Sequence, residues 1–282
     1  METMTTNYPS LTPEEKWEQA TLANNFIFYK VMRQHQDACK QLLEMLLGIK
    51  IESMEMKQEE TIALDYDSKG IRLDVFVKDS DRMFDVELQV ANTKELPERA
   101  RYYQGVMDVD TLKAGQKYKE LRDSHIIFIC LEDVFKNGLP VNTFANICLE
   151  DGKTKFGDRT YKHFFFVPLC AKMIEDKEVK AFFEFLISNQ ASSSYTDELK
   201  NYVADAKQST ENKMQFMTWE RQRAYDLDAG REEGIAIGAQ QKAVEDARSF
   251  YANGASIELI SKSLNMTIEQ VKEIVRDTEV SV

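Results

Sequence analysis

The stretch RLDVFVKDSDRMFDVELQ, residues 72–89, alternates apolar and polar side chains along most of its length. A period of two is typical of β-strands, whose successive side chains point to opposite faces. We predict two strands joined by a tight turn at Ser80 and Asp81. In that register residue 76 lies opposite residue 85, and Asp74 lies opposite Glu87.

The two faces of this predicted hairpin differ in their chemistry. One face is apolar and suits a core; it carries Leu73, Val75, Val77, Phe84, Val86, Leu88 and Val90. The other face is mostly polar; it carries Arg72, Asp74, Phe76, Asp85, Glu87 and Gln89. A slip of one residue would mix the two sets, so the pattern itself supports the register.

Acids on one face of a strand pair repel each other. Directly opposed side chains have Cβ atoms about 4.5 to 5.5 Å apart, and like charges placed so are destabilising. A divalent cation would offset this repulsion, and Mg²⁺ binds one or two carboxylates together with water and phosphate oxygens. The alternative is that Asp74, Asp85 and Glu87 are ordinary surface acids on the solvent face of a half-exposed sheet.

Composition limits the classes of function. The chain has 282 residues, 43% of them hydrophobic, which is enough for one large domain with or without a smaller appendage. Its net charge of -12 argues against a protein that coats nucleic acid, so contact with DNA must be local. The sequence has no apolar run of membrane-spanning length and no signal-peptide pattern, so we expect a cytoplasmic protein without a membrane partner. Its cysteines and histidines are widely spaced, which argues against disulfides and zinc.

The order of the expected elements predicts an α/β domain followed by helices. We expect one helix from Thr12 to about Leu47, which Gly48 ends, and one long helix over residues 96–122, either continuous or interrupted near Gly105 or Gly115. Strands are expected at residues 60–67, twice within 71–90, at 125–131, and near 144–150 and 162–169. The polar stretch 188–198 marks a boundary, which gives a first domain over residues 1–190 and a helical extension over 191–282.

Asp74 and the segment FDVELQ resemble the signature of the PD-(D/E)XK nuclease superfamily, and within it the Rpn (recombination-promoting nuclease) and transposase family of bacteria. That signature is an Asp on one strand and, on the next, Glu or Asp, any residue, and Lys. Here Asp74 matches the first acid and Glu87 the second, while Gln89 stands in the Lys position, as is usual in the Rpn branch. The segments NNFIFYKVM and ERARYYQGVMD extend the resemblance over roughly residues 10–190.

The resemblance implies a fold and a reaction. The fold is a restriction-endonuclease-like α/β core of helix, three strands, helix and strand, here with an all-helical C-terminal extension. The reaction is hydrolysis of DNA phosphodiester bonds by a metal-dependent endonuclease linked to recombination or mobile elements. Asp74 and Glu87 would hold Mg²⁺ or another divalent cation, with Asp85 as an additional ligand, and Gln89 would position the attacking water. Neutral Gln89 carries no charge to stabilise developing negative charge, which is a task of the family's Lys.

The helix predicted after the motif is the expected DNA-contacting surface. Residues 94–122 carry 7 basic and 5 acidic side chains in a chain whose net charge is -12. Arg99, Arg101 and Tyr102 are the DNA-binding candidates at its start. The alternative is that the two arginines pair with neighbouring acids and that the tyrosines pack on the sheet.

The C-terminal part has two further features. Gly230, Gly234 and Gly238 form one stripe on a predicted helix, which favours either a homo-oligomer formed through these helices or a broken linker helix. The segment FYANGASIELISKSLNMTIEQVKEIV predicts two short helices separated near Asn265, with Thr267 as the second N-cap, and resembles a helix-turn-helix. Acids outnumber bases in this segment, which disfavours contact with phosphates. The segment is therefore either a DNA reader or an element of packing or dimerisation.

Two interpretations compete with the endonuclease. A catalytically inactive relative would bind DNA or protein through the nuclease fold, and its acids would be surface groups. An acidic oligomeric scaffold would work through its glycine-striped helices, so truncation after about residue 195 would remove its activity. Only the enzyme would lose a Mg²⁺-dependent activity when Asp74 or Glu87 is replaced.

Overall fold

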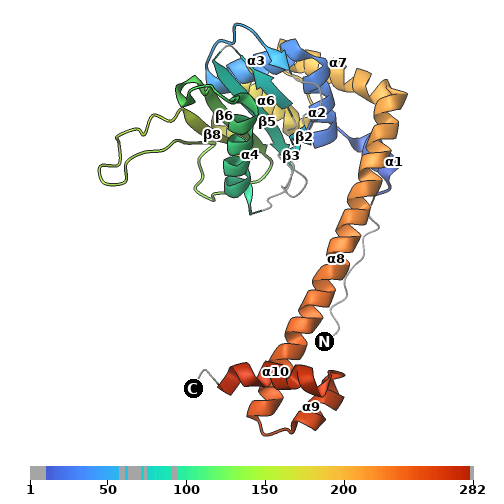
Figure 1. Cartoon of the computed structure of the whole chain (residues 1–282). Helices are drawn as coiled ribbons and strands as arrows, with labels where there is room; N and C mark the ends of the chain where they lie inside the picture. Colours follow the sequence, from blue (N-terminus) through green and yellow to red (C-terminus); the bar gives the residue numbers. More distant parts are fainter. Residues whose placement is uncertain are drawn as a thin grey trace. The chain divides into compact units, whose positions relative to one another are not determined.

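The computed structural model describes residues 11–56, 61–62, 71–72, 75–79, 81–90 and 94–279. The chain forms two compact units, and the boundary between them lies after Phe216. The first unit is a mixed α/β domain and the second is helical, so the predicted fold class is confirmed (Figure 1). The long helix α8 (Thr210–Ala252) runs from the first unit into the second.

A six-stranded mixed sheet forms the centre of the first unit, in the order β1-β4-β5-β6-β8-β7. These strands are β1 (Glu55–Met56), β4 (Val75–Lys78), β5 (Arg82–Gln89), β6 (Asp123–Cys130), β7 (Val141–Phe144) and β8 (Thr160–Phe166). β4 is antiparallel to β5, whereas β5, β6 and β8 are parallel neighbours. A separate short pair consists of β2 (Thr61–Ile62) and β3 (Ile71–Arg72).

The predicted hairpin register is confirmed where both strands are described. Phe76 pairs with Asp85, and Lys78 pairs with Met83. Asp79 holds the turn, because its carboxylate accepts hydrogen bonds from Arg82 Nη2 at 2.5 Å and from the backbone N–H of Ser53 at 3.2 Å. Leu73, Asp74 and Ser80 lie outside the described residues, and so does the predicted pairing of Asp74 with Glu87.

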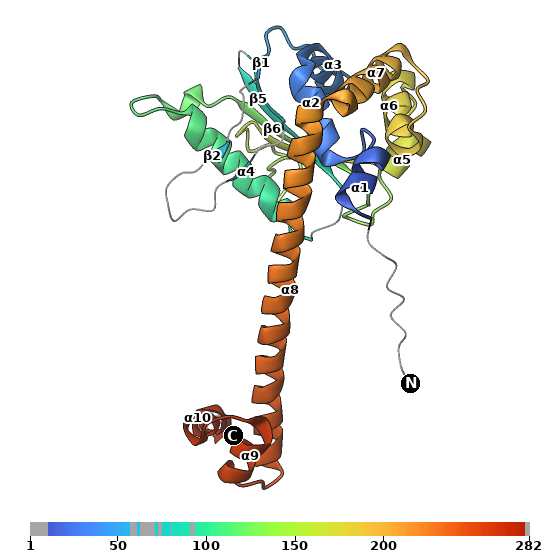
Figure 2. The ribbon, with the colours of Figure 1, turned by 90° about the vertical axis from the view of Figure 1, so that its right-hand side faces the viewer.

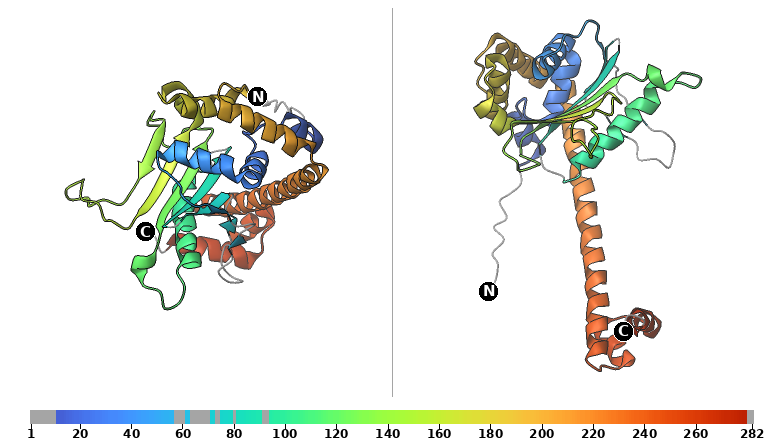
Figure 3. Two further views of the ribbon diagram at one scale, coloured as in Figure 1. Left: turned by 90° about the horizontal axis from the view of Figure 1, so that it is seen from above. Right: turned by 90° about the vertical axis from the view of Figure 1, so that its left-hand side faces the viewer.

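Helices cover both faces of this sheet. Figures 2 and 3 show α4 (Leu96–Thr111) on one side, and α2 (Asn25–Gln34), α3 (Gln36–Leu47) and α6 (Lys177–Ser188) on the other. The α4 side has its own apolar core, which includes Phe76, Met83, Leu96, Ala100, Met107, Ile126, Phe128 and Phe164. The acidic row of β5 shares this side, so it is not a solvent face. Asp85 is 0% exposed and Glu87 is 3% exposed.

The predicted single helix over residues 12–47 is wrong, since the structure has α1 (Pro13–Gln19), α2 and α3 in its place. Thr12 caps α1 in a capping box with Glu15, and Gly48 ends α3 in the left-handed conformation, as the sequence indicates. The first break has a clear cause. The Asn24 side chain accepts from the backbone N–H groups of the first turn of α2 and so starts a new helix.

Two further boundaries differ from prediction. α4 ends at Thr111 and a 3-10 turn, η1 (Tyr118–Glu120), follows, so the expected helix is not continuous but is interrupted around Gly115. The strand expected at 144–150 is wrong: β7 ends at Phe144, and a loop with one isolated bridge between Ile147 and Lys155 leads to β8. After β8 the apolar run continues as helix α5 (Val167–Met173), which has a proline in its first turn.

Helix α7 (Ser194–Gln208) and the start of α8 belong to the first unit. The Tyr195 hydroxyl donates to the backbone oxygen of Ala38 at 2.8 Å. The ring of Phe216 is fully buried, 5.2 Å from that of Trp17 and 5.4 Å from that of Phe26. A cut after residue 195 would therefore remove part of this core, whereas a cut after Phe216 would follow the boundary between the units.

The second unit is a small helical bundle. α9 (Ile257–Leu264) and α10 (Ile268–Glu279) pack with the end of α8 around Ala247, Ile260, Val271 and Val275. The predicted break is confirmed, because Asn265 ends α9 in the left-handed conformation and Thr267 exchanges capping hydrogen bonds with Gln270. The glycine stripe of α8 is exposed, and a Cβ added there would meet no described atom within 4 Å. Self-association through it stays a prediction. None of the described helices has the length and apolar character needed to cross a membrane.

Two neighbouring histidines of the sheet, His163 buried and His125 half-buried, predict a pH dependence of stability for the first unit. On the face away from α4, His125 Nδ1 lies 3.1 Å from His163 Nε2, and His163 Nδ1 lies 3.1 Å from Thr143 Oγ1. Burial lowers the pKa of His125 from 6.5 to about 3, helped by the charges of His163 and Arg82. Burial alone lowers the pKa of His163 to about 4.

We expect the free energy of unfolding to fall as the pH drops from 7.5 to 5.5. The unfolded chain takes up protons near pH 6.5, whereas the folded chain resists them down to about pH 4 at His163 and about 3 at His125. Stability is thus complete above the unfolded pKa and decreases below it, by up to about 1.4 kcal/mol per pH unit for each histidine. Urea unfolding of the wild type and of a His125→Gln/His163→Gln double variant measures this. An equal pH dependence in both proteins would contradict it.

Candidate functional site

The central strand β5 and the helix α4 bring the candidate residues together. Asp85, Glu87 and Gln89 alternate along β5 and point to the face that α4 covers. Each pairs in parallel register with an apolar residue of β6: Ile126, Phe128 and Cys130. The acids therefore lie beside apolar residues of β6 and beneath α4. The low polarity of these surroundings strengthens electrostatic interactions there.

Arg99 of α4 connects the side chains of the motif. Its Nη2 donates to Glu87 Oε2 at 2.6 Å, and its Nη1 donates to Gln89 Oε1 at 2.9 Å. Nη2 also contacts the Tyr103 hydroxyl at 3.1 Å. The guanidinium carbon lies 5.3 Å from the ring centre of Tyr103 and 5.5 Å from that of Phe128. Arg99 is a DNA-binding candidate from the sequence, and in the structure it forms an ion pair with Glu87 of the motif.

Tyr103 is a neutral partner in this cluster. Burial, together with the charge of Glu87, raises its pKa to about 12, although Arg99 opposes the effect. The phenol therefore stays protonated at neutral pH. It accepts a hydrogen bond from Arg99 and packs its ring against the guanidinium, and as a protonated phenol it offers no base for proton transfer.

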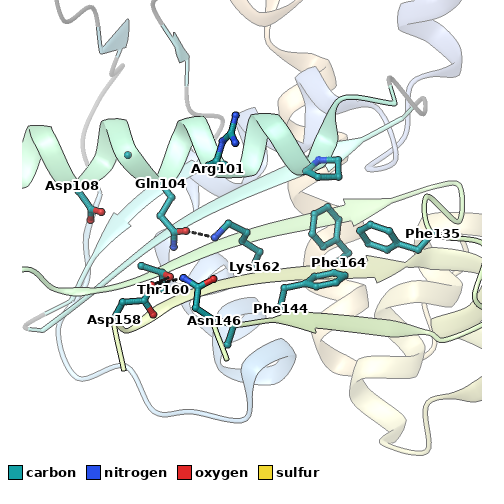
Figure 4. A pocket seen from close by; sticks show the side chains of 13 residues that line it. Arg101, Gln104, Asp108, Phe135, Phe144, Asn146, Asp158, Thr160, Lys162 and Phe164 are labelled. Carbon is teal, nitrogen blue, oxygen red and sulfur yellow. Dashed lines mark hydrogen bonds between the residues drawn. The ribbon is translucent and has the colours of Figure 1, made fainter. Parts of the chain in front are cut away.

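A hollow lies beside α4 on the side of β8 and β7, away from β5 (Figure 4). Its volume is about 600 Å³. Arg101 and Gln104 line it from α4, and Lys162 donates a short hydrogen bond to Gln104 Oε1 from β8. Burial lowers the pKa of Lys162 and raises that of Asp108 on the facing helix. Tyr102, the remaining DNA-binding candidate, is exposed on α4.

A family model described as PD-(D/E)XK nuclease family transposase matches residues 24–250. The chain belongs to this family. The match begins at the N-cap of α2 and includes the whole sheet and α4, so the resemblance that the sequence suggested is confirmed. It supports a nuclease-type function and implies DNA as the substrate class. No curated protein and no solved structure matches the chain.

PD-(D/E)XK nucleases typically use divalent metals, and the donors on β5 fit such an ion. Asp85 and Glu87 offer hard carboxylate oxygens two residues apart on one face of one strand. Mg²⁺ needs only one or two protein carboxylates when water and substrate phosphate complete its coordination. Within the described chain no three His, Cys, Asp or Glu side chains gather closely enough to share an ion. Asp74, the third predicted ligand, lies outside the described residues.

The sequence pattern placed the candidate residues of β5 on one face but did not predict the partner of Glu87. Glu87, Gln89 and Asp85 stand within five residues of one another, and the alternating pattern places them on one face. The contact of Arg99 depends on which way α4 turns above the sheet, and no local pattern gives that rotation. The only available signal was the alternative that the arginines of α4 pair with acids. For Arg99 the structure has that pairing, whereas Arg101 is exposed.

Proposed function

We propose that this member of the PD-(D/E)XK family is a metal-dependent DNA endonuclease associated with recombination or mobile elements. The observation that supports this most is the cluster on the α4 side of β5. There two acids are buried, and one of them is held at 2.6 Å by an arginine that also contacts Gln89.

In this proposal Asp74 and Glu87 hold Mg²⁺, and Asp85 is an additional ligand. The ion, when bound, would lower the pKa of a coordinated water and polarise the scissile phosphate. Arg99 fixes the direction of the Glu87 carboxylate, since a guanidinium is a rigid donor. Gln89 orients the attacking water by hydrogen bonding. Arg101 and Tyr102, both exposed on α4, contact the DNA backbone.

The burial of the acids favours an enzyme over a binding module. Removing a carboxylate from water costs several kcal/mol unless a partner compensates it. A module that only grips phosphate gains nothing from acids, because they repel the ligand. Asp85 and Glu87 are nevertheless retained beneath α4 at 0% and 3% exposure. A function that needs carboxylates, such as metal binding, explains why the fold keeps them there.

Nicking of supercoiled plasmid by the purified full-length protein tests the proposal. We expect cleavage with Mg²⁺ or Mn²⁺ and none with EDTA. Ca²⁺ serves as the control in which DNA binds without being cut. Cleavage that persists in EDTA, or a complete lack of cleavage with every ion, would overturn the proposed activity. The second outcome would favour the catalytically inactive relative that binds DNA or protein.

A further inference from the structure

We infer that Arg99 and Gln89 act as one unit that supplies the positive charge missing from the Lys position of the motif. The inference rests on the proposed nuclease function. Gln89 alone is neutral, and hydrolysis of a phosphodiester develops negative charge on the phosphate oxygens. Arg99 reaches this position from α4 rather than from β5.

The contact fixes which way the Gln89 amide points. Arginine carries only donors, so the atom of Gln89 that lies 2.9 Å from Nη1 must be its carbonyl oxygen. In the opposite orientation the amide NH₂ group would face the guanidinium N–H group, and two donors would oppose each other. The NH₂ group of Gln89 is therefore turned away from the guanidinium. It acts as a donor, which suits a phosphate oxygen or the lone pair of a water.

The arginine also changes the strength of that donor. A cation at the carbonyl oxygen draws electron density through the amide and makes its N–H groups more positive, as in any polarised hydrogen-bond chain. The rings of Tyr103 and Phe128 lie 5.3 and 5.5 Å from the guanidinium and shield part of it from water. The pair thus offers a donor and a nearby full charge, which are the two properties of a lysine ammonium.

Glu87 is compatible with this arrangement. Arg99 Nη2 donates to Oε2 of the Glu87 carboxylate at 2.6 Å. A carboxylate has about four acceptor positions and can serve a guanidinium with one oxygen and a cation with the other. Arg99 and a metal would still repel each other weakly through Glu87, and this gives the test a readout besides activity.

Arg99→Met tests the inference in the full-length protein. We expect kcat for plasmid nicking to fall by about 10² to 10³. We also expect the affinity for Ca²⁺, measured by calorimetry without DNA, to be unchanged or higher, because a competing cation has been removed. A merely structural role would lower both. Lys200→Met, which removes an exposed cation on α7, is the matched control and should change neither.

A rescue variant makes the test specific. The double variant Arg99→Met/Gln89→Lys places a positive charge directly at position 89. We expect its kcat to be at least about tenfold higher than that of Arg99→Met. If the wild type cleaves but Arg99→Met cleaves equally well, the inference fails while the nuclease proposal stands. A folded double variant as slow as Arg99→Met would also overturn it. A wild type without metal-dependent cleavage would instead defeat the proposed function.

The hollow on the far flank of α4 carries a second, independent proposal. We propose that it binds an unpaired nucleobase, from a single strand or a free nucleotide. Its volume of about 600 Å³ is in the range of small-ligand sites. Phe144 forms part of its wall and is 43% exposed. The Phe144 ring lies 5.0 Å from that of Phe135 and 5.8 Å from that of Phe164, so it is braced for stacking.

The polar end of this hollow favours a base over a phosphate or a cation. The basic side chains of Arg101 and Lys162 equal the acidic ones of Asp108 and Asp158 in number, so the lining of the hollow has no formal net charge. Figure 4 shows two hydrogen bonds in this lining. Lys162 donates to Gln104, and Asn146 donates to Asp158 at 2.5 Å. Donors and acceptors therefore stand side by side next to an aromatic wall. The edge of a nucleobase presents the same mixture.

Binding in EDTA, where no cleavage interferes, tests this second proposal. We expect a labelled single-stranded oligonucleotide to bind more tightly than its duplex, and Phe144→Ala to weaken single-strand binding by about 5- to 150-fold. Phe156→Ala, which removes a Phe that is 77% exposed on the neighbouring loop, is the matched control. If free nucleosides displace the oligonucleotide from the wild type but not from Phe144→Ala, the hollow takes its base from a free nucleotide. Equal binding of strand and duplex, unaffected by Phe144→Ala, would overturn the proposal.

Discussion

Glu87→Gln should reduce metal-dependent DNA cleavage by about a thousandfold or more. The substitution keeps the shape of the side chain and an acceptor for Arg99, whose Nη2 lies 2.6 Å from Glu87 Oε2. It removes the negative charge that would hold the ion. The rate of plasmid nicking in Mg²⁺, together with calorimetric Mg²⁺ binding, measures the effect.

Glu98→Gln is the matched control for Glu87→Gln. Glu98 lies in the first turn of α4, close in sequence to Arg99, but its side chain is exposed. We expect it to cleave at the wild-type rate. If Glu87→Gln also kept the wild-type rate, the buried acid would have no part in the reaction and the candidate site would be misplaced. The sequence predicts the same loss for Asp74→Asn.

Asp79→Ala should lower the free energy of unfolding by about 3 kcal/mol or more, because breaking one side of a buried ion pair leaves an uncompensated charge. Asp79 is 2% exposed. Its carboxylate accepts from Arg82 Nη2 at 2.5 Å and from Ser53 N and Oγ at 3.2 and 3.3 Å. These contacts close the turn between β4 and β5 and join it to the segment before β1. For a chain of this size the loss corresponds to a decrease in Tm of about 6 to 12 °C.

Asp81→Ala provides the comparison within the same turn. Asp81 also approaches Arg82, at 3.5 Å, but its side chain is 78% exposed. An exposed ion pair contributes about 0 to 1 kcal/mol, so this variant should unfold close to the wild type in urea. If the two variants lost equal stability, burial of Asp79 would not be the reason that the turn holds.

Local signals in the sequence predicted much of the fold. The alternation over residues 75–89 gave the register that pairs Phe76 with Asp85, and capping residues such as Thr12, Gly48 and Asn265 gave helix ends. Each of these depends on neighbours within a few residues. The break that Asn24 causes between α1 and α2 was missed, because continuous helical spacing of apolar residues masked a cap inside the run.

Features that depend on packing could not be predicted. The alternating pattern separates two faces of a hairpin but does not tell whether a helix covers the polar one. Burial of Asp85 and Glu87 follows from the position of α4, which only the assembled sheet determines. The resemblance nominates Glu87 and Gln89 as candidates, whereas their contacts with Arg99 are visible only in the folded chain. The hollow beside Lys162 likewise joins segments that are far apart in the chain.

The central position of β5 has a consequence for the backbone dynamics of the site. β5 is bonded to β4 on one side and to β6 on the other, and it is covered by helices on both faces. Amides in such a strand exchange with solvent deuterium only through the largest opening reactions, whose free energy approaches that of global unfolding. The amides of residues 84–88 should therefore be among the slowest to exchange. Fraying of β5 therefore cannot displace Asp85, Glu87 and Gln89 unless most of the domain opens with it.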